Sequence, residues 1–166
     1  MPRAAARTAP VYRTDSEIVV DAPPEAVWAV ITDFDRYPEW NRFTPRITLA
    51  SRDFEVGAEL DLDCQMTERE LLKDEHECIL AIEPARHAFC MGTSRKRGRP
   101  GIKSFRWQLC EAFGEGKTRL VNFEQFHGPL APLVHLLYAR KLEAAFERYC
   151  RDLKARVEGK RATRAA

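Results

Sequence analysis

The sequence lacks long apolar runs and any strong excess of one charge. No stretch approaches the ~18 consecutive apolar residues of a membrane helix, and the opening MPRAAARTAP lacks the apolar segment of a secretory signal. We therefore expect no integral membrane segment. The formal net charge of the 166 residues is only +2, so no strong field draws the whole molecule to nucleic acid, and we expect no such partner. With five cysteines and no secretory signal, we expect free thiols and a cytoplasmic location.

Recognisable catalytic and metal-binding motifs are also missing. The sequence contains no HExxH, no CxxC and no GxSxG, and its four histidines are scattered. The stretch GEGKT, residues 114–118, ends like a phosphate-binding loop, but Glu111 stands where that motif needs its first glycine. We interpret GEGKT as a hairpin turn. We predict neither a metal site nor a bound cofactor.

What the sequence does contain is a regular order of elements. A short strand at 14–20 precedes a helix at 22–34, which opens on a proline pair, and a single helical turn then reaches Trp40. The final stretch, 128–157, predicts one long helix. Between them the periodicity is two, which predicts strands at 46–51, 58–66, 74–82, 86–93, 102–112 and 117–126.

This order favours an antiparallel sheet with one long helix across its concave face, because each has one apolar face to bury. A curved sheet cannot contact a straight helix everywhere, so a cavity is expected between them. We expect a flexible segment at 1–12, a single domain at 13–157 and a disordered basic tail at 158–166. The stretch SRKRGRPG, residues 94–101, is expected to form a basic loop.

The block DAPPEAVWAVITDFDRYPEWN, the hairpins, and a last strand running into FHGPLAPLV resemble the START-like (SRPBCC) helix-grip superfamily. The resemblance covers roughly residues 14–156 and is greatest to its bacterial polyketide cyclase/dehydrase and lipid-transport group. It implies an α+β helix-grip fold, in which a seven-stranded antiparallel curved sheet wraps around a long C-terminal helix, with two short helices between strands 1 and 2. It implies an apolar cavity but no particular reaction, because the fold hosts carriers, receptors, cyclases, hydrolases and co-chaperone modules.

Strand alternation predicts which side chains face the cavity. Three strands have a clear apolar set, which we expect to point inward: Leu60, Leu62, Cys64 and Met66; Cys78, Leu80 and Ile82, with His76; and Phe105, Trp107 and Leu109. In the strand 86–93, Phe89 and Met91 compete with Ala88, Cys90 and Gly92, and we take Met91 as inward.

The last strand is ambiguous, because Leu120 and Phe126 alternate with Val121 and Phe123. The family pattern resembles the first assignment, which points Asn122 and Glu124 into the cavity. A buried carboxylate needs a partner or a raised pKa, and we expect Glu124 to pair with Lys141 or Arg140, or to bind a ligand hydroxyl. The alternative is that Glu124 points to water.

The aromatic stretch FDRYPEWNRF, residues 34–43, completes the predicted site. We expect Phe34 to join the core, Trp40 to contact a ligand near the cavity entrance, and Phe43 to lead into the second strand. The full predicted ligand-binding set is Trp40, Phe43, Leu60, Leu62, Cys64, His76, Cys78, Leu80, Met91, Phe105, Trp107, Leu109, Asn122, Glu124, Phe126, Leu133, Leu137 and Lys141.

Three classes of function fit this sequence. The favoured one is binding, and possible carriage, of a small hydrophobic molecule such as a lipid or polyketide-like compound. The second is a cyclase or dehydratase, for which Glu124 and His76 are the candidate acid and base. The third is a co-chaperone-like interaction module, which would have a filled cavity and an exposed apolar patch on the convex face of the sheet. The sequence identifies neither the ligand nor the oligomeric state.

Overall fold

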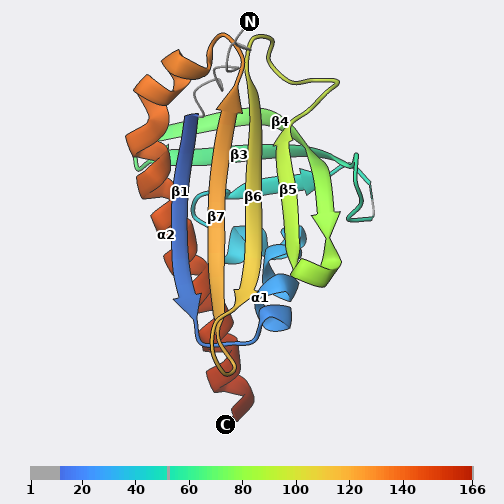
Figure 1. Ribbon diagram of the computed structural model, residues 1–166, viewed down its shortest axis with the longest axis vertical. Coiled ribbons are helices and arrows are strands. Elements are labelled where there is room, and N and C mark those ends of the chain that lie inside the picture. The colour runs from blue at the N-terminus through green and yellow to red at the C-terminus, as the bar shows by residue number, and fades with distance from the viewer. Residues whose placement is uncertain (1–11, 52, 166) are drawn as a thin grey trace, which may run out of the picture.

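The strands predicted from two-residue alternation form one antiparallel sheet, in the order β1-β7-β6-β5-β4-β3-β2 (Figure 1). The computed structural model describes residues 12–51 and 53–165, with side chains up to residue 159. The prediction of seven strands is confirmed. Their bounds are β1 (Tyr12–Val20), β2 (Arg46–Leu49), β3 (Glu59–Thr67), β4 (Glu70–Glu83), β5 (Ala88–Thr93), β6 (Lys103–Ala112) and β7 (Thr118–His127).

Two short helices lie between β1 and β2, as predicted: α1 (Pro24–Ile31) and the 3₁₀ helix η1 (Phe34–Glu39). Pro24 occupies the first turn of α1, where its missing N–H leaves no bond unmade. A second 3₁₀ turn, η2 (Pro84–Arg86), links β4 to β5. Both α1 and η1 bury apolar side chains, so they close one end of the curved sheet.

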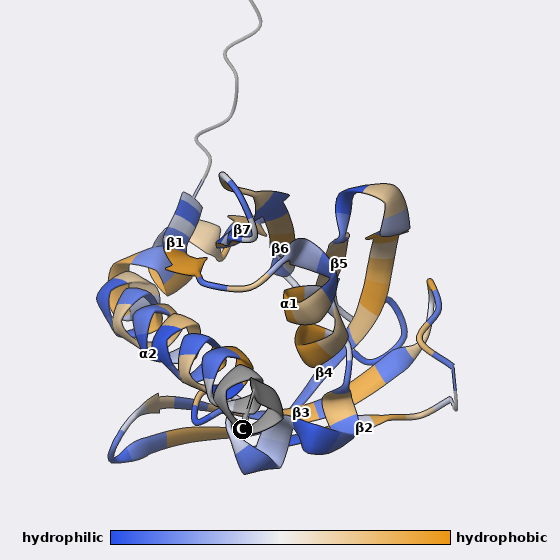
Figure 2. Ribbon diagram, turned by 90° about the horizontal axis from the view of Figure 1, so that it is seen from below, coloured by the Kyte–Doolittle hydropathy of each residue, from blue (hydrophilic) through white to orange (hydrophobic). Residues whose placement is uncertain are grey.

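The long helix α2 (Ala131–Ala165) lies in the hollow of the sheet, which curves around it in Figure 2. Its middle turns bury Ala145, Phe146, Tyr149 and Leu153 completely. The helix includes residues 158–165, so the predicted disordered tail at 158–166 was wrong for that range, because Lys, Arg and Ala are strong helix formers. Residues 1–11 of the predicted flexible segment lie outside the described residues, and Tyr12 already belongs to β1. No helix in the described part of the chain is long and apolar enough to cross a bilayer.

A cluster of aromatic rings lies where α1 and η1 meet the sheet. Trp28, Phe34, Phe54 and Phe89 pack edge to face with ring centroids 5.4–6.2 Å apart. Such pairs stabilise by about 0.5–1.5 kcal/mol each beyond the area that they bury. Phe34 is 4% exposed, as expected of a core residue.

The facing of β6 is opposite to the prediction. Arg106 pairs with Glu124 across β6 and β7, and Gln108 pairs with Asn122, so these four side chains share the concave face. The prediction that Phe105, Trp107 and Leu109 face the cavity was therefore wrong. They lie on the convex face, where Trp107 stands opposite Phe123 and Leu109 opposite Val121.

The facing of β4 also differs. Leu60 of β3 pairs with Glu77 and Leu62 pairs with Glu75, so both glutamates point inward. His76, Cys78 and Leu80 consequently face the convex side, and their predicted inward placement was wrong. A bulge between Ile79 and Ala81 then shifts the register, so that Ile79 pairs with Met91 and Ile82 with Phe89.

Candidate functional site

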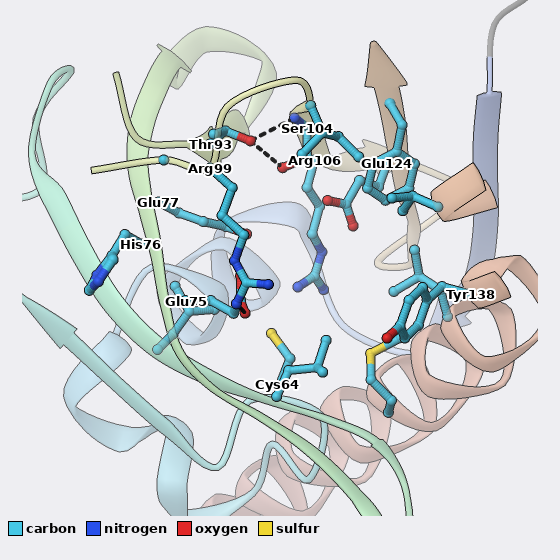
Figure 3. A pocket seen from close by; sticks show the side chains of 18 of the residues that line it. Cys64, Glu75, His76, Glu77, Thr93, Arg99, Ser104, Arg106, Glu124 and Tyr138 are labelled. Atoms are coloured by element: carbon cyan, nitrogen blue, oxygen red, sulfur yellow. Dashed lines mark hydrogen bonds and ion pairs between the residues drawn. The ribbon is translucent and has the colours of Figure 1, made fainter. Parts of the chain in front are cut away.

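A pocket of about 240 Å³ lies between the sheet, the first turns of α2 and the β5–β6 loop. Side chains from β3, β4, β6, β7 and α2 line it (Figure 3). Its apolar lining is Phe43, Leu62, Cys64, Met66, Leu72, Ile102, Phe126, Val134, Tyr138 and Leu142. Its polar lining includes Glu75, Glu77, Thr93, Arg97, Arg99, Ser104, Arg106 and Glu124.

Arg106 is the central polar group of this pocket. It is 4% exposed, and its Nε donates a hydrogen bond of 2.8 Å to Oδ1 of Asn122. The rings of Phe43, Phe146 and Tyr149 surround its guanidinium carbon at 4.7–5.0 Å, a cation–π arrangement that offsets part of the cost of burial. Its buried Nη2 has no hydrogen-bond partner among the described residues, and Figure 3 shows the guanidinium directed into the pocket. An oxygen of a bound molecule could accept a hydrogen bond from this N–H.

Two carboxyl groups share the pocket with Arg106. Burial raises the pKa of Glu77 from 4.5 to about 8, assisted by the negative charge of Glu124 and opposed by Arg106. Burial likewise raises the pKa of Glu124 from 4.5 to about 7, against the positive charge of Arg106 and a hydrogen bond from Ser104. The enclosed Oε2 of Glu77 has no partner among the described residues. Both carboxyls therefore titrate close to neutral pH, where a carboxyl can donate a proton and a carboxylate can accept one.

The prediction that Glu124 faces inward is confirmed. Its expected pairing with Lys141 or Arg140 was wrong, and the alternative, a hydrogen bond to a ligand hydroxyl, stays a prediction. Lys141 Nζ instead pairs with Glu70 Oε2 at 2.7 Å, at the rim formed by the β3–β4 turn. The charge that lies with Glu124 is Arg106, from the neighbouring strand. Asn122 is also inward, where it accepts from Arg106 and donates to Ser16 Oγ at 3.1 Å.

His76 does not join Glu124. Its Nδ1 lies 2.6 Å from Oδ1 of Asp61, and the same Asp61 oxygen accepts a hydrogen bond of 2.7 Å from Arg97. Although His76 borders the pocket, Figure 3 shows its ring pointing away from it. The predicted acid–base pair of His76 and Glu124 was wrong, because successive residues of a strand point to opposite faces and Glu77 takes the inward position.

Cys64 projects its thiol into the pocket (Figure 3). Burial, assisted by the charge of Glu77, raises the pKa of this thiol well above its ordinary value. A neutral thiol is a poor nucleophile, so Cys64 acts here as an apolar wall. Among the described residues, no three His, Cys, Asp or Glu form a group that could hold a metal ion.

The remaining predicted residues divide by position. Phe43, Leu62 and Phe126 line the pocket as placed. Leu60 and Met91 face inward but are packed within the core, outside the lining. Trp40 was wrongly placed at the entrance: it packs against Tyr37 and Tyr149, with ring centroids at 5.1 and 5.7 Å.

On α2, the predicted lining residues were also wrong. Leu133 and Leu137 are 52% and 56% exposed, and their neighbours Val134 and Tyr138 line the pocket instead. On the convex side, Leu80 and Phe105 border a second hollow of about 680 Å³ beneath the β5–β6 loop. The Cys78 side chain is buried there beside Thr93.

Glu77, Arg106 and Tyr138 were missed. A signal for Arg106 was present in the hairpin turn. Ala112 pairs with Thr118 at the turn, so the residues six positions away from it on each strand, Arg106 and Glu124, also pair. Choosing Glu124 as inward therefore requires Arg106 to be inward too. For Glu77 the sequence offers no comparable signal, because the β3–β4 pairing contains irregularities of register.

Comparison with known proteins agrees with this architecture. A family model described as polyketide cyclase/dehydrase and lipid transport matches residues 12–158. No curated protein matches the chain in sequence. Its fold is similar to that of the Zhui aromatase/cyclase from Streptomyces sp. R1128, at 17% identity and a TM-score of 0.69, over 89% of this chain and 94% of that one.

Two further solved structures are similar in fold. A START superfamily protein from Mycobacterium smegmatis has 18% identity and a TM-score of 0.65, covering 89% of this chain and 97% of that one. Norcoclaurine synthase from Thalictrum flavum, in complex with dopamine and hydroxybenzaldehyde, has 14% identity and a TM-score of 0.68, covering 90% and 87%. At these identities the likeness shows the fold alone.

Proposed function

The chain belongs to the polyketide cyclase/dehydrase and lipid-transport family, and from this premise we propose that it binds a small, largely apolar molecule in the pocket between the sheet and α2. The observation that carries the proposal is Arg106, a buried guanidinium whose Nη2 has no partner among the described residues, in a pocket whose other walls are mainly apolar. A buried donor without a partner is costly, and a ligand oxygen would satisfy it.

The polar groups define the chemistry of the ligand. Arg106 offers an N–H, and a protonated Glu77 offers an O–H beside it, so the site suits a carbonyl or hydroxyl oxygen at one end of the molecule. The apolar wall formed by Leu62, Met66 and Phe126 suits a hydrocarbon or aromatic body. A polyketide-like compound or a small oxygenated lipid has both features.

The size of the pocket restricts the ligand further. Its volume of about 240 Å³ lies just below the ~300–1,000 Å³ of typical small-molecule sites. This favours a compact molecule over a lipid with two long chains. The presence of an open pocket also favours ligand binding over a co-chaperone-like module, for which we expected a filled cavity.

A second candidate function is a cyclase or dehydratase. The observation that favours it is the pair of carboxyls in the pocket, whose pKa values of about 8 and about 7 lie close to neutral pH. Glu77 would act as the general acid and Glu124 as the general base, with Arg106 donating to a carbonyl or enolate oxygen. Such a reaction needs both carboxyls, whereas binding needs mainly the pocket and Arg106.

Native mass spectrometry of the purified protein, followed by solvent extraction, tests the binding function directly. A co-purifying molecule of modest mass that is lost on extraction would support it. The paired variants Cys64→Phe and Trp107→Ala locate the site. Cys64→Phe fills the pocket and is expected to weaken binding of the extracted compound, or of a neutral apolar fluorophore, by about tenfold or more.

Trp107→Ala is the matched control, because it removes a large aromatic ring from the convex face of the same sheet. It is expected to leave binding unchanged. Equal loss in both variants, or in neither, would contradict a site between the sheet and α2. The enzymatic candidate is tested separately by Glu77→Gln and Glu124→Gln, which should abolish turnover of a bound polyketide-like substrate while retaining its binding.

A further inference from the structure

Three leucines in the first turns of α2, and a fourth directly before the helix, are exposed to solvent. Leu130, Leu133, Leu136 and Leu137 are 45%, 52%, 81% and 56% exposed, and we call them the leucine patch. Their spacing places them along one side of the first turns of the helix. The described part of the chain has only two other large exposed apolar side chains, Val56 and Phe113. Contiguous exposed apolar side chains of this kind mark interaction surfaces.

Basic residues adjoin the leucine patch. The amide of Leu130 donates a hydrogen bond of 3.0 Å to the carbonyl of Gly101, at the end of the basic loop 94–101. Gly128, at φ +107°, permits this close approach, since a Cβ there would lie 2.6 Å from that carbonyl oxygen. Figure 1 shows the start of α2 and the β5–β6 loop at the same end of the molecule.

The charged residues of the two segments that form this surface are all basic. Residues 94–103 contain five Lys and Arg, residues 127–142 contain two, and neither segment contains Asp or Glu. Arg97 and Arg99 form ion pairs with Asp61 and Glu75, on neighbouring strands. No ion pair is recorded within the described residues for Arg95, Lys96, Lys103 and Arg140, all of which are exposed.

The pocket reaches solvent beside the same two segments, since its lining residues Arg97 and Arg99 are exposed. Arg97, Gly98, Arg99 and Ile102 border it from the loop, and Val134 and Tyr138 border it from α2. Leu133 directly precedes Val134 and Leu137 directly precedes Tyr138, and both leucines are exposed to solvent. A surface that covers the leucine patch would therefore cover the opening of the pocket as well.

We propose that the leucine patch and the basic loop dock on the surface of a membrane rich in anionic lipids, with the pocket opening turned towards the bilayer. A lipid bilayer offers an apolar layer for the leucines directly beneath a layer of negative headgroups, and this matches the combination observed. An acidic protein would need a groove shaped for four leucines as well as the charge, and nucleic acid offers no apolar layer. Docking in this orientation gives a hydrophobic ligand a route between bilayer and pocket without crossing water.

Vesicle co-sedimentation tests the proposal with the full chain. Vesicles of phosphatidylcholine alone are compared with vesicles that also contain phosphatidylglycerol, at low and high salt. We expect binding to the anionic vesicles that weakens as salt is raised, because exposed charges are screened. The double variants Leu133→Ser/Leu137→Ser and Arg95→Glu/Lys96→Glu should each weaken binding by about tenfold or more. All four side chains are exposed, so the variants should keep the wild-type circular dichroism and unfolding temperature.

Matched controls lie at the opposite end of the molecule, in the β6–β7 turn (Figure 1). Phe113 is 48% exposed, and Lys117 is an exposed cation. Phe113→Ser and Lys117→Glu each make, at one position, the same kind of apolar or charge change as the double variants, and both should leave vesicle binding unaltered. Loss of binding in these controls would overturn the proposed docking surface.

Three other outcomes would also overturn the proposal. One is absence of binding to either vesicle, and another is equal binding to neutral and anionic vesicles. The third is a stable dimer in light scattering that Leu133→Ser/Leu137→Ser dissociates, which would assign the patch to a second copy of the chain. Binding to heparin without binding to vesicles counts as absence of membrane binding. Vesicle binding is measured without a pocket ligand, so its failure leaves the ligand-binding function standing, and a failed ligand assay leaves the docking result standing.

Discussion

Arg106 shows how a single buried charge organises the concave side of the sheet. Three aromatic rings and the amide of Asn122 hold its guanidinium, and its charge opposes the burial that raises the pKa of Glu77 and Glu124. Without this positive charge the pKa values of both carboxyls would be higher still. Arg106 therefore affects both the packing of the sheet and the protonation of the two carboxyls in the pocket.

The substitution Arg106→Met tests this role. Methionine keeps an unbranched apolar chain but removes the donor to Asn122, which leaves a buried amide oxygen without its partner. We expect the free energy of unfolding to fall by roughly 1–3 kcal/mol, measured by chemical denaturation. The control is Arg119→Met, which removes an exposed ion pair with Glu111 and should cost less than about 1 kcal/mol. Equal costs would show that Arg106 contributes no more than a surface cation.

At the scale of elements, the order of strands and helices could be predicted because it follows from hydrophobic period and turn residues. The facing of β6 could not be predicted, because its polar side chains point to the concave side of the sheet and its most apolar ones to the convex side. Arg106, which lines the pocket, and Gln108, which accepts a hydrogen bond from Tyr149, occupy the concave face. This leaves Trp107 on the convex face, half-buried against Phe123. Counting apolar residues fails where a binding site places polar side chains inside.

Irregular strand pairing was the second reason why the residues that face the pocket could not all be predicted. Register shifts between Leu62 and Cys64, and between Ile79 and Ala81, change which residues share a face, and no residue type in these strands announces them. The position of Glu77 depends on such details. Leu133 and Leu137 were misplaced for a different reason, because an apolar helix face predicts burial and this end of α2 is exposed.

The two halves of α2 should consequently differ in energetic importance. Phe146 is fully buried and packs edge to face with Phe43, at a centroid distance of 5.4 Å, whereas Leu136 is 81% exposed. Phe146→Ala is expected to destabilise by about 3–5 kcal/mol through lost burial and a cavity. Leu136→Ala should change stability by less than about 0.5 kcal/mol. Denaturant titrations of both variants provide the comparison, and a large cost at Leu136 would mean that this end of the helix is covered in the folded protein.

At the scale of the whole molecule, the net charge is small but the two ends differ in composition. One end carries the basic loop, the leucine patch and the pocket opening, and α1 and η1 close the sheet with an aromatic core. The fold is shared by proteins with quite different functions, so function here rests on the groups inside the pocket. Those groups are titratable, and their state should be visible in the stability of the whole protein.

The pH dependence of unfolding makes this visible. The folded-state pKa values of Glu77 and Glu124 are raised from 4.5 to about 8 and about 7. A raised pKa means that the folded protein binds more protons than the unfolded chain between these values. Stability is therefore fully present below about pH 4.5 and is lost as the pH rises towards 8, by at most ~1.4 kcal/mol per pH unit for each group. The pKa values of Asp61 and Asp63 are lowered, so their contributions are lost only at more acidic pH and do not obscure this window.

Glu77→Gln isolates one of the two groups, because glutamine imitates the protonated carboxyl at every pH. Thermal unfolding followed across the window should show a shallower loss of stability for this variant than for the wild type. The two proteins should match near the acidic end, and the variant should be the more stable near pH 8. Glu115→Gln, in the exposed β6–β7 turn, provides the control and should reproduce the wild-type profile. Parallel profiles for Glu77→Gln and the wild type would mean that Glu77 is ionised in the folded protein, and its role as a proton donor in the pocket would have to be abandoned.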